Sequence, residues 1–300
     1  MPLSYLHYDV FTAVPLLGNQ LAVFTDARDL DASRMQAIAR EMNFSESTFI
    51  FPSERPDTDI RMRIFTPWNE LPMAGHPTIG STFALARSGV IAAGAGRFVF
   101  GLNIGPIPVD LEWTDGALSF AWMTQRAPTF GPIVSDRAPV AAALSLEVTD
   151  LADNLPVQEV TCGLPYLLVA LKNHQAVDRA VSDKAGFGRL CEACGLDLPI
   201  FLFAVGGPSP SDTVYGRMFA PEYGIVEDPA TGSACGPVGC YLVEHGLVTG
   251  AAAQSIVISQ GVAMGRASRI HVAIDGRPGA IDRVRVGGVA VLVARGELLV

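Results

Sequence analysis

Two glycine-containing segments carry side chains suited to proton transfer and to anion binding. In segment 227–236, sequence EDPATGSACG, Asp228 precedes a proline, and small residues lead into an apolar run. Proline drives the residue before it out of helical conformation, so we expect a tight loop that feeds the start of a helix. A helix start offers unpaired backbone N–H groups and a partial positive charge, which suit a carboxylate. Gly232 and Ser233 lie in this loop.

Segment 70–77, sequence ELPMAGHP, repeats the pattern earlier in the chain. Gly232 and Gly75 lie 157 residues apart (232 − 75), and the same offset pairs the glutamates and the prolines of the two segments. Upstream, segment 63–67, RIFTP, resembles segment 217–221, RMFAP, at an offset of 154 (217 − 63). Matches that keep the same order along the chain indicate a duplicated domain.

The two halves of this repeat differ where chemistry is possible. Three pairs of matched positions differ in character: Glu46 and Leu198 (198 − 46 = 152), Asp228 and Leu71, and His76 and Ser233. Two facing loops would form a cleft between the halves, and ligand sites often lie at such interfaces. Each polar residue also has a purely structural interpretation. Glu46 could be a solvated loop acid and His76 a hydrogen-bonded structural histidine. Asp228 could brace its turn, and Ser233 could cap a helix. Their convergence favours a site in the cleft.

Helices and strands that would position these residues can be read from the periodicity. The expected elements are a helix from an Asp31 N-cap to about Asn43, a strand 48–51, a strand 61–65, a helix 78–88 before Gly89, a strand 214–219 and a helix 237–245. The last helix of each half is apolar on nearly all faces, which is typical of a buried helix. We therefore expect an α+β protein in which each half is a sheet or barrel rolled round one helix.

Composition agrees with folded domains and excludes some functions. Hydrophobic residues make up 49% of the 300 residues, enough for two cores, and we place the domains at 1–128 and 129–300, with the last strands able to cross back. The net charge of −9 argues against nucleic-acid binding. Neither a signal peptide nor a membrane-spanning run is visible, so we expect a cytoplasmic protein. Cys191 and Cys194 form a C-x-x-C without a second ligand pair, so no metal site is expected.

Four sequence blocks resemble the PhzF family of phenazine biosynthesis. They are GNQLAV at 18–23, NFSESTF at 43–49, AGHPTIG at 74–80 and EDPATGSA at 227–234. A later block, with QG at 260–261 and GRAS at 265–268, is similar to the family's GRPS except that Ala267 replaces the proline. The resemblance covers nearly the whole chain and keeps the order of the blocks.

The resemblance implies a fold, a reaction and roles for residues. The fold would be that of diaminopimelate epimerase, with two pseudo-symmetric, mainly antiparallel domains. The activity would be that of an isomerase that moves a proton within trans-2,3-dihydro-3-hydroxyanthranilate or a similar small carboxylate, without a metal or organic cofactor, as a homodimer. By this resemblance Glu46 carries the proton, and His76, Asp228 and Ser233 contact the substrate. The backbone amides of the two loops, at Gly75 and Gly232, can supply further donors to bind its carboxylate. A glutamate that accepts and then donates one proton suits such a shift.

Two other functions stay open from the sequence. The first is an amino-acid epimerase or racemase on the same fold. Enzymes of that kind place a cysteine just before each loop glycine, where this chain has Ala74 and Thr231, and neither side chain can act as a thiolate base. The second is a non-catalytic protein that binds a small ligand or a partner in the old cleft. A proton carrier such as Glu46 would be unnecessary in a binding protein.

Overall fold

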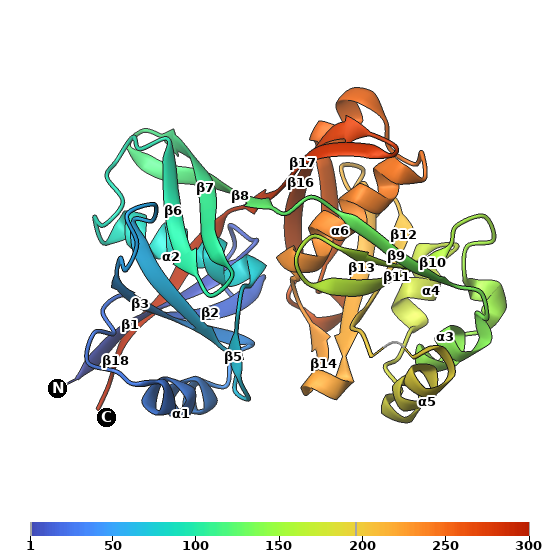
Figure 1. Ribbon diagram of the computed structural model, residues 1–300, viewed down its shortest axis with the longest axis horizontal. Coiled ribbons are helices and arrows are strands. Elements are labelled where there is room, and N and C mark those ends of the chain that lie inside the picture. The colour runs from blue at the N-terminus through green and yellow to red at the C-terminus, as the bar shows by residue number, and fades with distance from the viewer. Residues whose placement is uncertain (1, 196, 300) are drawn as a thin grey trace. The chain divides into compact units, whose positions relative to one another are not determined.

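The structure is a computed structural model that describes residues 2–195 and 197–299 (Figure 1). It forms two compact units, the first made of Met1–Thr124 with Val286–Val300 and the second of Gln125–Arg285. Among the described residues, no helix has the length and apolar character that crossing a membrane requires.

In the part of the first unit that the structure describes, two helices lie among the strands. Its elements are β1 (Leu3–Val10), β2 (Asn19–Phe24), α1 (Ala32–Met42), β3 (Glu46–Pro52), β4 (Ile60–Phe65), β5 (Glu70–Leu71), α2 (Gly75–Arg87), β6 (Arg97–Leu102), β7 (Gly105–Thr114), β8 (Ala117–Gln125) and, from the end of the chain, β18 (Ala290–Leu298). The caps predicted from the sequence are confirmed. Asp31 accepts a hydrogen bond from the Arg34 backbone at the start of α1, and Asn43 ends that helix in the left-handed conformation.

Additional α-helices and short 3-10 helices distinguish the second unit. Its elements are β9 (Thr129–Val134), α3 (Ala138–Ala143), β10 (Val157–Thr161), β11 (Pro165–Ala170), α4 (His174–Arg179), α5 (Lys184–Cys194), β12 (Ile200–Val205), β13 (Val214–Ala220), β14 (Ile225–Asp228), α6 (Gly232–Glu244), β15 (Ile256–Gln260), β16 (Ser268–Arg277) and β17 (Ala280–Gly288). The short helices α3 and α4 were not predicted, because six residues are too few to establish a helical period.

Strand pairing is the same in both units. In the first unit β1–β2, β3–β4, β4–β5 and β6–β7 are antiparallel, whereas β2–β3 and β4–β6 are parallel. Raising every label by nine gives the pairings of the second unit, with the same directions. This match confirms the duplication and the mainly antiparallel α+β fold.

The last strand of each repeat belongs to the other unit. Strand β9, which ends the first repeat, pairs with β10 of the second unit, and β18, which ends the second repeat, pairs with β1 of the first. Leu3 is thereby opposite Leu298. The first and last strands of the chain, β1 and β18, consequently both lie in the first unit (Figure 1).

Helices α2 and α6 are the buried helices predicted from the sequence. Every residue from Gly75 to Leu85 and from Gly232 to Val243 is buried. The expected start of the second helix at residue 237 is wrong, since α6 begins five residues earlier. Pro237 lies inside α6, where it lacks the N–H that would bond the Ser233 carbonyl, and this proline made the sequence look like a helix start.

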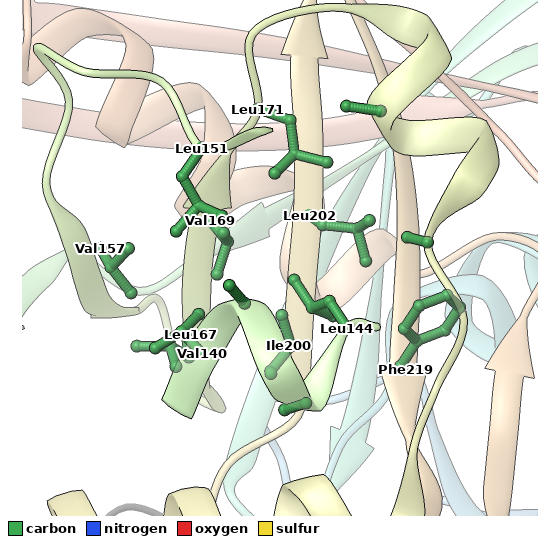
Figure 2. Close-up of a cluster of buried hydrophobic side chains, with 14 of the residues drawn as sticks. Val140, Leu144, Leu151, Val157, Leu167, Val169, Leu171, Ile200, Leu202 and Phe219 are labelled. Carbon is green, nitrogen blue, oxygen red and sulfur yellow. The ribbon is translucent and has the colours of Figure 1, made fainter. Parts of the chain in front are cut away.

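Sheets of both units are covered on two faces. In the second unit α6 packs on one face, and a cluster that includes Val140 of α3 covers the other, with Leu167 and Val169 of β11 and Ile200 and Leu202 of β12 pointing into it (Figure 2). In the first unit α2 and α1 take the corresponding places. Strands buried on both faces read as continuous apolar runs, which explains the composition of β11 and β12.

The strand register corrects one sequence match. Phe65 and Phe219 are equivalent at an offset of 154, and they lie opposite Ser47 and Ile200 respectively. Ser47 therefore corresponds to Ile200, at an offset of 153, so Glu46 corresponds to Pro199 and not to Leu198. An error of one residue exchanges the two faces of a strand. The contrast on which the prediction depended remains, because proline carries no titratable group.

Candidate functional site

The predicted site residues fall into two groups, one in each unit. Glu46, Gly75 and His76 lie in the first unit, and Asp228, Gly232 and Ser233 lie in the second. Gly75 and Gly232 are the first residues of α2 and α6, and neither helix has a side-chain cap at its N-terminus. Both helix starts are therefore suited to a carboxylate ligand. That the two groups face each other across one cleft stays a prediction.

Glu46 and His76 are brought together by the start of β3 and the first turn of α2. The Glu46 Oε2 atom lies 3.3 Å from His76 Nδ1, and the two side chains are only 12% and 4% exposed. Successive side chains of β3 point to opposite faces of the sheet, and this alternation explains the contact. Thr48, two residues after Glu46, hydrogen-bonds Ser81 of α2, so Glu46 is on the face of the strand that points toward this helix.

Burial sets the protonation of His76. Desolvation lowers the pKa of the imidazole from 6.5 to about 3, against a smaller raising effect from a hydrogen bond to the Gln20 backbone. At neutral pH the ring is uncharged, so its contact with Glu46 is not an ion pair of opposite charges. A neutral imidazole can donate one hydrogen bond and accept another.

We expect His76 to make the protein sensitive to acid. Its pKa is 6.5 when unfolded and about 3 when folded, so between these values the unfolded state binds more protons. The free energy of unfolding should therefore fall as the pH drops from 6.5 toward 3, by up to about 1.4 kcal/mol per pH unit. Urea unfolding across this range should show a shallower pH slope for His76→Asn. Equal slopes for the two proteins would contradict the assignment.

Asn19 is a residue of this region to which sequence reasoning assigned no role. It is 1% exposed at the start of β2, and its Nδ2 atom lies 3.3 Å from His76 Nδ1. Its Oδ1 atom accepts a hydrogen bond from Ser45 Oγ at 3.2 Å. The sequence block GNQLAV contained Asn19, but only the fold shows that it contacts the helix α2.

Asp228 belongs to a buried hydrogen-bond network in the second unit. Its Oδ2 atom accepts a 2.5 Å hydrogen bond from Thr231 Oγ1. Gln260, which is fully buried, accepts from the Thr231 backbone N–H at 2.9 Å and donates from Nε2 to the Asp228 carbonyl at 2.8 Å and to Thr231 Oγ1 at 2.9 Å. The Thr231 hydroxyl thus holds Asp228 and is not available as a base.

Ser233 has an aromatic partner that the sequence did not indicate. The Ser233 Oγ atom lies 2.7 Å from the hydroxyl of Tyr166, a buried residue at the start of β11. Ser233 corresponds to His76 in the repeat, and it likewise lies at the second position of its helix. Each repeat therefore presents a polar side chain at the same place, held by a polar partner from the neighbouring sheet.

An arginine–glutamate pair supports the approach to each loop. Arg63 donates from Nε and Nη2 to both oxygens of Glu70, at 2.8 and 2.6 Å. Arg217 makes the same two bonds to Glu227, at 2.9 and 2.7 Å. Glu227 immediately precedes Asp228, so this pair fixes the strand that delivers Asp228.

The cysteines give no support to a thiolate base. Cys235 is in α6, where burial and the nearby charge of Asp228 raise the pKa of its thiol. A thiol with a raised pKa remains protonated and does not act as a base at neutral pH. Cys191 and Cys194, the C-x-x-C pair, lie partly exposed at the end of α5.

Comparison with known proteins places the chain in a family. Residues 8–296 match the sequence pattern of the phenazine biosynthesis-like proteins known as PhzC-PhzF. The trans-2,3-dihydro-3-hydroxyanthranilate isomerase of Pseudomonas aeruginosa is 37% identical over 293 residues, which cover 98% of each chain.

Solved structures agree in fold. A crystal structure of a PhzF-family phenazine biosynthesis protein from Bacillus anthracis superposes with a TM-score of 0.89 at 27% identity, over 100% of both chains. A hydroxyproline epimerase from Agrobacterium vitis, at 12% identity, has a TM-score of 0.64 over 99% of this chain and 92% of its own, which is a likeness of fold alone. The chain belongs to the PhzF family of phenazine biosynthesis-like proteins and is an isomerase.

Proposed function

We propose that the protein moves a proton within a small cyclic or amino-carboxylate substrate, with Glu46 as the single carrier and without a cofactor. The observation that carries the proposal is the Glu46 carboxyl group, largely buried and 3.3 Å from an imidazole that burial keeps neutral. The Pseudomonas aeruginosa relative supports chemistry of the trans-2,3-dihydro-3-hydroxyanthranilate type.

In the proposed reaction, atoms and charge balance without a second reactant. The Glu46 carboxylate takes a proton from one carbon of the substrate, and the electron pair left behind spreads over the conjugated system. The carboxylic acid then returns the proton to another carbon, so a double bond moves and the substrate is neither oxidised nor reduced. Backbone amides at Gly75 and Gly232 would hold the substrate carboxylate, with Asp228 and Ser233 as further contacts.

Amino-acid epimerisation is less well supported by the residues present. Thr231 occupies the position of one expected thiol, and its hydroxyl hydrogen-bonds Asp228 and Gln260. Ala74, at the other position, has no group that can accept a proton. The carboxylate of Glu46 would act alone, whereas direct inversion of a carbon requires a base on each face.

A deuterium experiment tests the proposal. The protein is incubated in heavy water with trans-2,3-dihydro-3-hydroxyanthranilate and, separately, with cyclic amino acids. We expect a product whose double bond has moved, with solvent deuterium below full occupancy because one carrier can return the proton that it took. Inversion of an α-carbon without movement of a double bond would favour the epimerase. Binding of these compounds without exchange or product would favour a non-catalytic protein.

A further inference from the structure

Two polar residues around the loop before α6 replace apolar residues of the first repeat. Asp228 and Thr231 correspond to Leu71 and Ala74 at the offset of 157 (228 − 71 and 231 − 74). In both repeats a strand ends at the first of these positions, a loop of three residues follows (72–74 and 229–231), and a helix begins directly after the second. The first repeat builds this loop with leucine and alanine, so the loop itself requires neither a carboxylate nor a hydroxyl.

Gln260 is a third exchange of the same kind. The parallel pairs β4–β6 and β13–β15 are equivalent and match Phe100 to Ile258, so Gln260 takes the place of Leu102 at an offset of 158 (260 − 102). Leu102 is 6% exposed, and Gln260 is fully buried. A buried amide costs free energy unless it is hydrogen-bonded, whereas a buried leucine stabilises the core. The polar side chain at this position is therefore explained by the groups that it binds.

The directions of the hydrogen bonds join these three residues into one unit. Gln260 Oε1 accepts from the Thr231 backbone N–H at 2.9 Å, so its NH₂ group is the part that donates to the Asp228 carbonyl and to Thr231 Oγ1, at 2.8 and 2.9 Å. The Thr231 hydroxyl accepts from this NH₂ group and gives its own single proton to Asp228 Oδ2, at 2.5 Å. Gln260 therefore binds both ends of the loop, and Thr231 binds the carboxylate.

We propose that Thr231 and Gln260 are positioning residues that hold the Asp228 carboxylate in one orientation. Thr231 holds one oxygen directly, and Gln260 joins the two ends of the loop so that Thr231 faces Asp228. The use of this arrangement rests on the proposed function, in which Asp228 contacts the substrate. The carboxylate torsion of an aspartate is broad, so the group turns when no partner holds it. A misplacement of about 1 Å at a site can cost about 10²-fold in rate.

Crystal structures of ligand-free variants test the orientation without any substrate. Thr231→Val keeps the shape of the side chain and removes the hydroxyl, whereas Thr231→Ser keeps the hydroxyl. We expect the Asp228 carboxylate to leave its wild-type orientation in Thr231→Val and to keep it in Thr231→Ser. Gln260→Leu, which installs the residue of the first repeat, should displace loop 229–231 and turn the carboxylate with it.

An unchanged carboxylate in either variant would overturn the role of the residue that is replaced. Gln260→Leu also leaves the Thr231 backbone N–H without its partner. Thr231→Val makes no change to the backbone hydrogen bonds of the loop, so it decides the proposal if Gln260→Leu does not fold.

Kinetics with trans-2,3-dihydro-3-hydroxyanthranilate separate positioning from a purely structural role. We expect Thr231→Val and Gln260→Leu each to lower kcat by about 10²-fold, with Thr231→Ser close to wild type. Gln175→Leu makes the same change as Gln260→Leu at an exposed position of α4 and should leave kcat and KM unaltered. Residues that act through Asp228 lose their effect when its side chain is absent, so adding Thr231→Val to Asp228→Ala should bring no further loss of kcat.

Two results would overturn the link to catalysis. One is a further loss of about 10²-fold when Thr231→Val is added to Asp228→Ala, since Thr231 would then act independently of Asp228. The other is wild-type kcat in a Thr231→Val protein whose carboxylate has turned. If the wild type has no isomerase activity on any probe, the proposed function fails, while the crystal structures still decide whether Thr231 and Gln260 hold Asp228.

Discussion

Glu46→Gln should abolish turnover on any true substrate while the protein keeps its fold and its ligand. Glutamine has nearly the shape of glutamate and can still hydrogen-bond, but it cannot take a proton from carbon. General acid–base groups contribute about 10²–10⁴-fold, and a sole carrier that both accepts and donates should reach the upper end of that range. The affinity for a substrate analogue should change by less than tenfold, or about 1.4 kcal/mol. Stopped assays of product and equilibrium binding measure the two effects.

Two further variants define the kinetic signature of the carrier. Glu41→Gln makes the same chemical change at an exposed position of α1 and should leave kcat and KM unaltered. His76→Ala should weaken binding and turnover together, because His76 positions the substrate. Near-native turnover in Glu46→Gln would show that another group carries the proton, and Asp228 would be the next candidate.

Arg217→Met should destabilise the protein far more than the equivalent change in the first repeat. Arg217 is 8% exposed, and besides its two bonds to Glu227 it donates from Nη1 to the carbonyls of Val177 and Ala180, at 3.0 and 2.7 Å. Removal of one partner from a buried ion pair leaves an uncompensated charge and costs about 3–5 kcal/mol. Urea unfolding measures this loss of free energy.

The internal repeat supplies the control for this measurement. Arg63→Met breaks the matching pair, whose side chains are 24% and 25% exposed, so water can compensate Glu70. For such a pair we expect a loss of about 1 kcal/mol or less. Glu227→Gln added to Arg217→Met should recover part of the stability, since it removes the unpaired charge. Equal losses for Arg217→Met and Arg63→Met would show that burial of the pair contributes little.

The sequence alone was sufficient to predict the helix caps, the duplication and the two buried helices. The N-cap at Asp31 and the positive φ of Gly89 depend on neighbouring residues alone, so they can be read directly. The match of Glu46 to Leu198 failed by one residue because a strand offset depends on pairing with Phe65 and Phe219, which only the sheet shows.

The partners of the predicted site residues could not be read in the same way. Asn19 contacts His76 across 57 residues, and Tyr166 contacts Ser233 across 67. Such contacts depend on which strands flank each buried helix and on which face each side chain points. Single asparagine and tyrosine residues carry no periodic signal, so the resemblance of motifs identified His76 and Ser233 but gave no role to the residues that contact them.

The exchange of final strands has a consequence for synthesis on the ribosome. Strand β1 lies between β2 and β18, so its second edge stays unpaired until translation has passed Leu298. The second unit receives β9 before its own strands are made, and it can complete its sheet earlier. The unit that emerges first is therefore finished last. Until then it presents an open strand edge, which can pair with another chain. Nascent chains stalled before β18 should depend most on chaperones.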